Sequence, residues 1–303
     1  MSTARNSIAI PFAVGCLGIA LFSIMDAVMK HLVLEIGTYN ALVWRNGAGA
    51  LLAGAFFLGT RNRWPGKAVM RVHLTRGLVA TVMAVLFFWG LGRVPMAQAI
   101  ALAFIAPLIA LFLAAILLGE TIERRAIFAS LLGLAGVVVI FAGQARADLG
   151  PEALAGSLAI LLSACLYAYN IILMRQQAQV AGPIEVAFFM SGITALVLAL
   201  AAPVLGEVPA MEHWPMILLG SVLAFGSLVM LAWAYARAQA QHLAPVEYTS
   251  FIWAALLGWF IFAEPVGWFT LAGAALIVLA CLIAASRRRA PDPVPQAETG
   301  VPG

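Results

Sequence analysis

Residues 96–118 read MAQAIALAFIAPLIALFLAAILL and contain no charged side chain. A helix of this length rises about 35 Å at 1.5 Å per residue, which is enough to cross the roughly 30 Å hydrocarbon core of a bilayer. The stretch lacks the alternation of polar and apolar residues that is typical of a transmembrane β-strand. Because a chain in lipid must satisfy its own backbone hydrogen bonds, the stretch is predicted to be a membrane-crossing helix.

The composition of the whole chain extends this prediction. Of 303 residues, 64% are apolar and 10% are charged, against roughly 25% charged residues in an ordinary soluble domain. These charged side chains are too few to cover the surface of a water-soluble globule of this size. The composition therefore excludes a soluble enzyme and a disordered protein. The three cysteines lie singly within apolar runs, so neither a disulfide framework nor a zinc site is predicted.

Apolar stretches of about 18 to 23 residues recur along almost the whole chain and predict ten membrane-crossing helices. The expected spans are residues 8–31, 37–58, 74–92, 96–118, 126–143, 153–174, 183–203, 214–236, 243–262 and 267–285. The first span is too long for a cleaved secretory signal and contains Asp26 and Lys30, so we expect it to be retained.

The positions of Lys and Arg in the links between spans predict the orientation. With a cytoplasmic N-terminus, 13 of the 17 basic residues fall on the cytoplasmic side, including a cluster from Arg61 to Arg76, and three fall on the other side. We therefore expect residues 1–7 to be a cytoplasmic N-terminus and the proline-rich residues 287–303 to be a disordered cytoplasmic tail. The expected location is the cytoplasmic (inner) membrane. Because topology accounts for the basic excess, no nucleic-acid partner is predicted.

The chain contains an internal duplication at a spacing of 144 residues. The matched pairs are Trp89 with Trp233, Arg93 with Arg237, Glu120 with Glu264, and Asp26 with Asn170. Because each copy has five helices, an odd number, the second copy enters the membrane from the opposite face. The predicted fold is an all-α integral membrane protein of ten transmembrane helices, built as two inverted five-helix repeats, residues 8–143 and 153–286, around a central cavity. Such halves suit alternating access, and a duplicated scaffold is the structural alternative.

Short motifs follow the same order in the two copies. Residues 106–107 read AP, 117–120 read LLGE, 136–137 read GV, and 262–265 read FAEP. In this order they resemble the EamA type of the drug/metabolite transporter superfamily over residues 8–286, with Ala263 in the place of the motif glycine. The ten spans and cytoplasmic termini look most similar to the YddG-like amino-acid and metabolite exporters. That resemblance implies export of aromatic or other small neutral amino acids.

Ionisable residues inside apolar spans usually face a cavity or a partner. Asp26 and Arg45 are expected near the outer ends of the first two spans, at depths that differ by about 5 Å. Either they form an ion pair that ties two helices together, or Arg45 faces the cavity and binds a substrate carboxylate. Glu264 is assigned to structure, because a carboxylate favours the positive end of the helix that follows it.

Polar residues at helical spacing predict two walls of the cavity. Asp26 and Lys30 share one face of the first span, and Tyr167 and Asn170 share one face of the sixth. Interhelical hydrogen bonding is the alternative for Asn170. Trp253 lies near the middle of the ninth span, where its ring is expected to line the substrate pocket.

Three further residues are candidates for the transport cycle. Glu247 and Gln98 are predicted to be gate or proton-coupling residues, and contact with interfacial water is the alternative for both. Pro107 removes a backbone hydrogen bond from the fourth span and is predicted to be a hinge.

No enzyme motif, cofactor site or metal site is found in the sequence, and the four histidines are scattered. We expect a secondary transporter that exports small organic solutes, above all amino acids. The alternatives are transport of another metabolite or drug, such as a nucleoside, polyamine or cationic compound, a channel, or a membrane-embedded enzyme. The expected partners are a small-molecule substrate and membrane lipid. Small residues along the fifth span suit close packing within the chain or in a homodimer.

Overall fold

The computed structural model describes residues 3–59, 64–118, 124–146, 150–235, 237 and 240–285, which fold almost entirely into helices and contain no strand. The first half contains α1 (Thr3–Gly59), α2 (Lys67–Leu91), α3 (Met96–Ala103), α4 (Ala106–Leu118) and α5 (Arg124–Arg146). The second half contains α6 (Gly150–Ala178), α7 (Pro183–Ala199), α8 (Ala202–Leu205), the 3₁₀ turn η1 (Met211–His213), α9 (Trp214–Tyr235), α10 (Ala240–Phe262) and α11 (Trp268–Ala285). The all-α prediction is confirmed. The expected tail at residues 287–303 and the motif at 119–120 lie outside the described residues.

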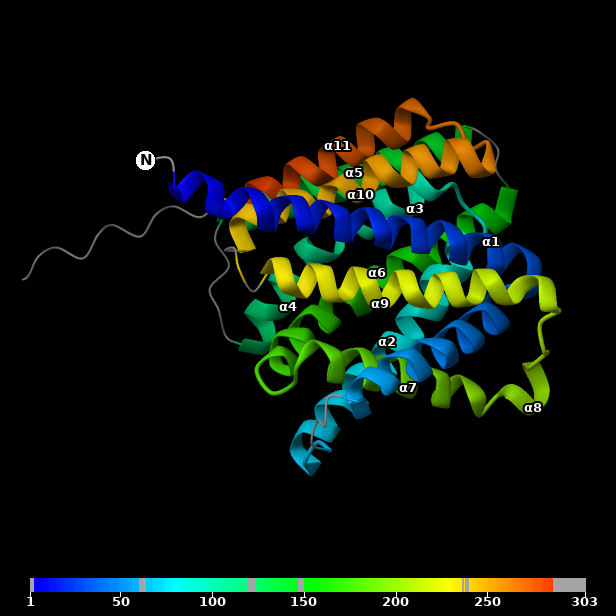
Figure 1. The fold of residues 1–303 in the computed structure, drawn as a ribbon. Coiled ribbons are helices and arrows are strands. Elements are labelled where there is room, and N and C mark those ends of the chain that lie inside the picture. The colour runs from blue at the N-terminus through cyan, green and yellow to red at the C-terminus, as the bar shows by residue number, and fades with distance from the viewer. Residues whose placement is uncertain are drawn as a thin grey trace, which may run out of the picture.

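Helix α1 consists of two helices that meet at Gly37. This residue has φ 77° and ψ 159°, which a glycine adopts without the steric penalty of a Cβ atom. Figure 1 shows the chain turning at the end of the first part of α1 and running back at an angle to it. The break lies at the start of the second predicted span, residues 37–58, so α1 contains the first two spans.

The fourth predicted span is also interrupted. Helix α3 ends at Ala103 and α4 begins at Ala106, and the amide of Ile105 bonds to the carbonyl oxygen of Leu102 at 3.3 Å in a tight turn. Pro107 is the second residue of α4, where a missing N–H removes no helical hydrogen bond. The break lies just before Pro107 and does not result from a hydrogen bond that this proline removes, and the role of Pro107 as a hinge stays a prediction.

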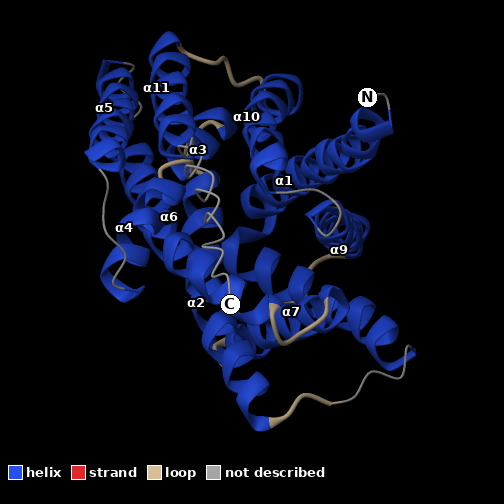
Figure 2. Ribbon diagram, turned by 90° about the vertical axis from the view of Figure 1, so that its left-hand side faces the viewer, coloured by secondary structure: helices blue, strands red, loops and turns tan. Residues whose placement is uncertain are grey.

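The helices pack in long pairs. Helix α1 packs against α9 and α7, α2 against α6, and α5 against α11, and the pair α5 and α11 lies side by side in both views (Figures 1 and 2). A Cβ atom on Gly136 of α5 would lie 2.7 Å from the carbonyl oxygen of Gly273 of α11, so glycine is needed for this approach. The small residues of the fifth span thus serve packing within the chain.

The core and the outer surface are both apolar. Met25, Met29 and Leu32 of α1 are at most 1% exposed and pack with Leu91 of α2 and Leu102 of α3. Large apolar side chains also cover the outside of the described helices, where lipid rather than water is the suitable solvent. Among the described residues, five helical stretches are long and apolar enough to cross a membrane, and four more apolar helices are shorter.

Candidate substrate cavity

A cavity of about 210 Å³ lies between helices from both halves of the chain. Its walls come from the second part of α1, from α2, α6, α7 and α9. The polar and charged side chains that line it are Arg45, Arg76, Asn170, Ser191 and Ser221. The rest of the lining is mostly apolar. Two guanidinium groups in a largely apolar cavity make it a candidate binding site for an anionic group.

Asp26 and Arg45 lie close together, but they do not form the ion pair that their depths allow. The two charges interact electrostatically, yet among the described residues no carboxylate lies within 4.0 Å of the Arg45 guanidinium. Asp26 is 2% exposed, and its Oδ1 has no hydrogen-bond partner in the described part of the chain. The Nε atom of Arg45 is likewise buried without a partner there. Both groups therefore keep unused hydrogen-bonding capacity.

Arg76 is the main functional candidate that sequence reasoning missed. The charge pattern of the sequence groups Arg76 with a cytoplasmic cluster of basic residues, whereas it lies within α2 and lines the cavity. Its Nε donates to Oδ1 of Asn170 at 3.1 Å, and its Nη1 donates to Oε1 of Gln177. The signal in the sequence was its position inside the third predicted span, residues 74–92, which should have ranked it with Arg45.

Gln177 is held in turn by a buried histidine. Its Nε2 lies 2.6 Å from Nδ1 of His73, and Nε2 of His73 lies 2.9 Å from Oε1 of Glu185. A carboxylate accepts hydrogen bonds, so these partners assign the proton to His73 Nε2 and make Nδ1 the acceptor for the Gln177 amide. The amide oxygen of Gln177 then faces Arg76, as the contact requires.

The remaining predicted site residues lie outside this cavity. Tyr167 is 38% exposed and interacts electrostatically with Arg76 and Glu247. Glu247 accepts a hydrogen bond from the hydroxyl of Tyr235 at 2.6 Å. Trp253 is 36% exposed on α10 and lines neither this cavity nor the smaller pocket described next.

A second cluster ties α1, α3 and the link between α10 and α11 together. Lys30 is 3% exposed, forms an ion pair with Glu264 and donates to the carbonyl oxygen of Val94 at 2.7 Å. The other carboxylate oxygen of Glu264 accepts from the backbone amide of Met96 at 2.8 Å. Glu264 therefore stabilises the N-terminus of α3, and not that of the helix that follows it in the chain.

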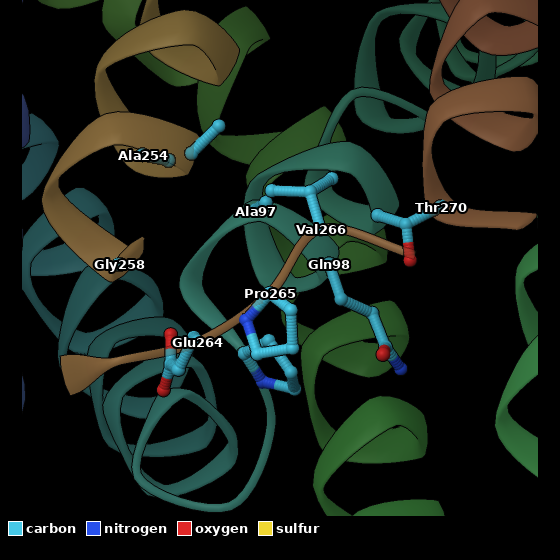
Figure 3. Close-up of a pocket in the computed structure, with 10 residues that line it drawn as sticks. Ala97, Gln98, Ala254, Gly258, Glu264, Pro265, Val266 and Thr270 are labelled. Atoms are coloured by element: carbon cyan, nitrogen blue, oxygen red, sulfur yellow. The ribbon is translucent and has the colours of Figure 1, made fainter. Parts of the chain in front are cut away.

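Gln98 lies beside this cluster, in the wall of a pocket of about 20 Å³. Figure 3 shows Glu264, Pro265 and Val266 of the link passing α3, which carries Gln98. The Nε2 atom of Gln98 lies 3.2 Å from Oε1 of Gln144 and 3.1 Å from Oγ of Ser157. These bonds connect α3 to α5 and α6. Among the described residues, no group of three or more His, Cys, Asp or Glu side chains is arranged to hold a metal ion.

Two segments of the chain, residues 9–142 and 154–286, match the EamA-like transporter family. The chain belongs to this family. As a family member it is a multi-pass membrane transporter of small molecules and not an enzyme. The resemblance to the drug/metabolite transporter superfamily is thereby confirmed.

Several proteins with named substrates are similar to this EamA-family chain along most of its length. The pseudopaline exporter of Pseudomonas aeruginosa is 28% identical over 276 residues, which cover 88% of this chain and 93% of the relative. The riboflavin transporter of Rhizobium johnstonii is 29% identical, covering 88% and 87%. The S-adenosylmethionine uptake transporter of Rickettsia prowazekii is 25% identical, covering 88% and 89%. A crystal structure at 23% identity has a TM-score of 0.58 and covers 91% of this chain and 97% of that one, which supports the fold alone.

Proposed function

We propose that this chain is a secondary transporter that works by alternating access, with ten membrane-crossing helices in two inverted repeats, residues 8–143 and 153–286. The helix boundaries support the repeat. Helix α10 occupies residues 240–262, which lie 144 positions after residues 96–118, the stretch from the start of α3 to the end of α4. Helix α11 begins at Trp268, 144 positions after the start of α5 at Arg124.

The packing of the helices supports the same symmetry. Under the shift of 144 positions, the first part of α1 corresponds to α6, and α2 corresponds to α9. The contact of α2 with α6 then has its counterpart in the contact of α9 with α1, while α5 and α11 exchange places. A pseudo-twofold relation between the two halves generates such paired contacts, and inverted repeats are one form of it.

The solutes we propose are amino acids, moved out of the cell. The observation that carries this proposal is the cavity between the two halves, where the Arg45 guanidinium lines the wall as a donor for a carboxylate and the charge of the buried Asp26 lies in electrostatic range of it. Asn170 adds a polar group from the second half, and Tyr167 lies outside the cavity in electrostatic range of Arg76. The relatives support small organic substrates, and they include both an exporter and uptake transporters.

The proposed location is the inner membrane, with both termini in the cytoplasm. In this orientation Lys30, Glu264 and Gln98 lie near the outer side, and their contacts close that side while the cavity is reached from the cytoplasm. The break before Pro107 is the proposed hinge, because residues between two helices absorb a change of backbone angle more easily than residues within one. Trp253 is proposed to face the pathway in another state of the cycle.

A flux assay tests the proposed function. Liposomes that contain the purified protein and labelled threonine, methionine, tryptophan or glutamate are expected to release at least one of these faster than protein-free liposomes do. Equal release across the whole panel would contradict amino-acid transport. Direction is tested in cells, where added expression should raise resistance to toxic amino-acid analogues. Greater sensitivity would indicate uptake instead.

Glu247 is the proposed site of proton coupling. Its contact with Tyr235 holds the carboxylate near Tyr167, which is also in electrostatic range of Arg76 at the cavity. If protons drive export, Glu247→Gln should abolish the acceleration of flux by a pH gradient and leave exchange of internal for external substrate intact. Glu212→Gln, at an exposed carboxylate, is the matched control. An unchanged gradient response in Glu247→Gln would remove this residue from the proton path.

A further inference from the structure

The charges around the cavity do not balance. Arg45 and Arg76 both line it, whereas Asp26 is the carboxylate that interacts with Arg45. In the described part of the chain, no carboxylate lies within 4.0 Å of either guanidinium. Two cations and one anion leave one positive charge uncompensated in surroundings that are mostly apolar, which is costly unless a ligand neutralises it.

Arg45 is not saturated by its protein contacts. Its Nη1 lies 3.2 Å from Oδ1 of Asn46, its Nη2 lies 3.7 Å from the sulfur of Met25, and its Nε is buried without a partner among the described residues. An amide oxygen and a thioether are weak, neutral acceptors for a guanidinium. A carboxylate is a stronger acceptor for the same donors.

Arg76 is oriented by neutral groups and not neutralised by them. Asn170 and Gln177 take its Nε and Nη1, while Nη2 donates to no residue in the described ranges. The carboxylate of Glu185 contacts His73, at the end of this chain of contacts that is far from Arg76. The network therefore fixes the plane of the Arg76 guanidinium and leaves its charge for a ligand.

We propose that the preferred substrates are amino-acid-like organic anions with two carboxylates and one ammonium group. One carboxylate binds Arg45 and the second carboxylate binds Arg76, while the ammonium group is attracted by the charge of Asp26, which interacts with Arg45 from behind the cavity wall. This assignment rests on the proposed function and narrows it. Arg76 is then the residue that distinguishes an acidic amino acid from a neutral one of similar size.

The first test compares substrates in proteoliposomes that contain the full-length protein. Labelled glutamate should be transported with a kcat/KM about tenfold or more above that of methionine, because one additional charge-assisted contact contributes at least that factor. Glutarate, which lacks the ammonium group, should compete less well than glutamate. If methionine is preferred to glutamate, this inference is wrong and amino-acid transport still stands. If nothing in the panel moves, the proposed function fails with it.

The second test uses variants on α2. Arg76→Gln should lower glutamate transport at least about tenfold more than methionine transport, and Arg76→Lys should retain part of the preference for glutamate because it keeps the charge. Arg71→Gln, at an exposed position on the same helix, is the matched control and should behave as the unmodified protein. Equal loss of glutamate and methionine transport in Arg76→Gln would overturn the assignment.

A binding measurement covers the case in which a variant inserts poorly. Glutamate should raise the unfolding temperature of the unmodified protein in detergent, because a ligand that binds only the folded state stabilises it. The same glutamate concentration should give no shift for Arg76→Gln, whereas Arg71→Gln should show the full shift. An equal shift in Arg76→Gln would show that this arginine does not contact the second carboxylate.

Discussion

At the scale of single residues, Ala263 fixes the geometry of the cluster around Lys30. Among the described residues that are not glycine, Ala263 alone has a positive φ, which is 53°. The amide of Glu264 bonds back to the carbonyl oxygen of Gly258 at 3.0 Å, and Ala263 precedes it in the left-handed conformation that glycine adopts more easily. This turn ends α10 and directs Glu264 to Lys30 and to the N-terminus of α3.

Replacing Ala263 by glycine is expected to stabilise the protein. The left-handed conformation costs an alanine about 1–2 kcal/mol, part of which is offset because glycine gains more freedom in the unfolded chain. Ala263→Gly should therefore raise the free energy of unfolding by up to about 1 kcal/mol, measured as a higher unfolding temperature in detergent. The control Ala255→Gly, inside α10, should lower it by about 1 kcal/mol. A lower unfolding temperature for Ala263→Gly would contradict the account.

At the scale of elements, the interruption between α3 and α4 separates two helices that differ in the contacts that hold them in place. Helix α3 is almost entirely buried and anchored at its start by Glu264 and through Gln98. Helix α4 packs mainly against α6. Because Phe104 and Ile105 lie in the turn between them, the proposed hinge predicts that rotation at these residues moves α4 without disturbing the anchored α3.

Removing the proline at this turn should affect transport more than folding. Pro107→Ala restores a backbone N–H and allows one continuous helix, so we expect glutamate and methionine flux to fall about tenfold or more while the helical content by circular dichroism stays equal or rises. Pro203→Ala in the short helix α8 is the matched control, with flux near that of the unmodified protein. Full flux in Pro107→Ala would exclude the hinge.

At the scale of the whole molecule, the proposed mechanism requires halves of opposite topology. The links that follow α1 and α8 are equivalent under the shift of 144 positions, and Gly66 and Ala210 are exposed equivalent positions in them. In inverted repeats these two positions lie on opposite sides of the membrane, whereas in parallel repeats they lie on the same side. This difference separates the two arrangements without a structure in lipid.

Cysteine labelling reports the difference. In a background without Cys16, Cys165 and Cys281, the variant Ala210→Cys should react with a membrane-impermeant maleimide added to intact cells. Gly66→Cys should react only after the membrane is permeabilised. Reaction of both from the outside, or of neither, would contradict inverted repeats with cytoplasmic termini.

The sequence by itself was enough to predict that the chain lies in lipid, that it is all-α and which family it belongs to. Apolar runs in lipid leave the backbone one local solution, the helix, so helical spans can be predicted from the residues alone. The exception at this level was Arg76, which lies within a predicted span and was nevertheless counted with the loop charges.

Only the tertiary structure decided which charges meet. Lys30 and Glu264 are separated by 234 positions, and Arg76 and Asn170 by 94, so no local spacing relates them. A buried charge is held by whichever partner the packing brings within a few ångströms. In the assembled helices Glu264 contacts Lys30 and the N-terminus of α3, and Arg76 contacts two neutral amides. Asp26 and Arg45 each keep a buried atom that forms no hydrogen bond with a described residue.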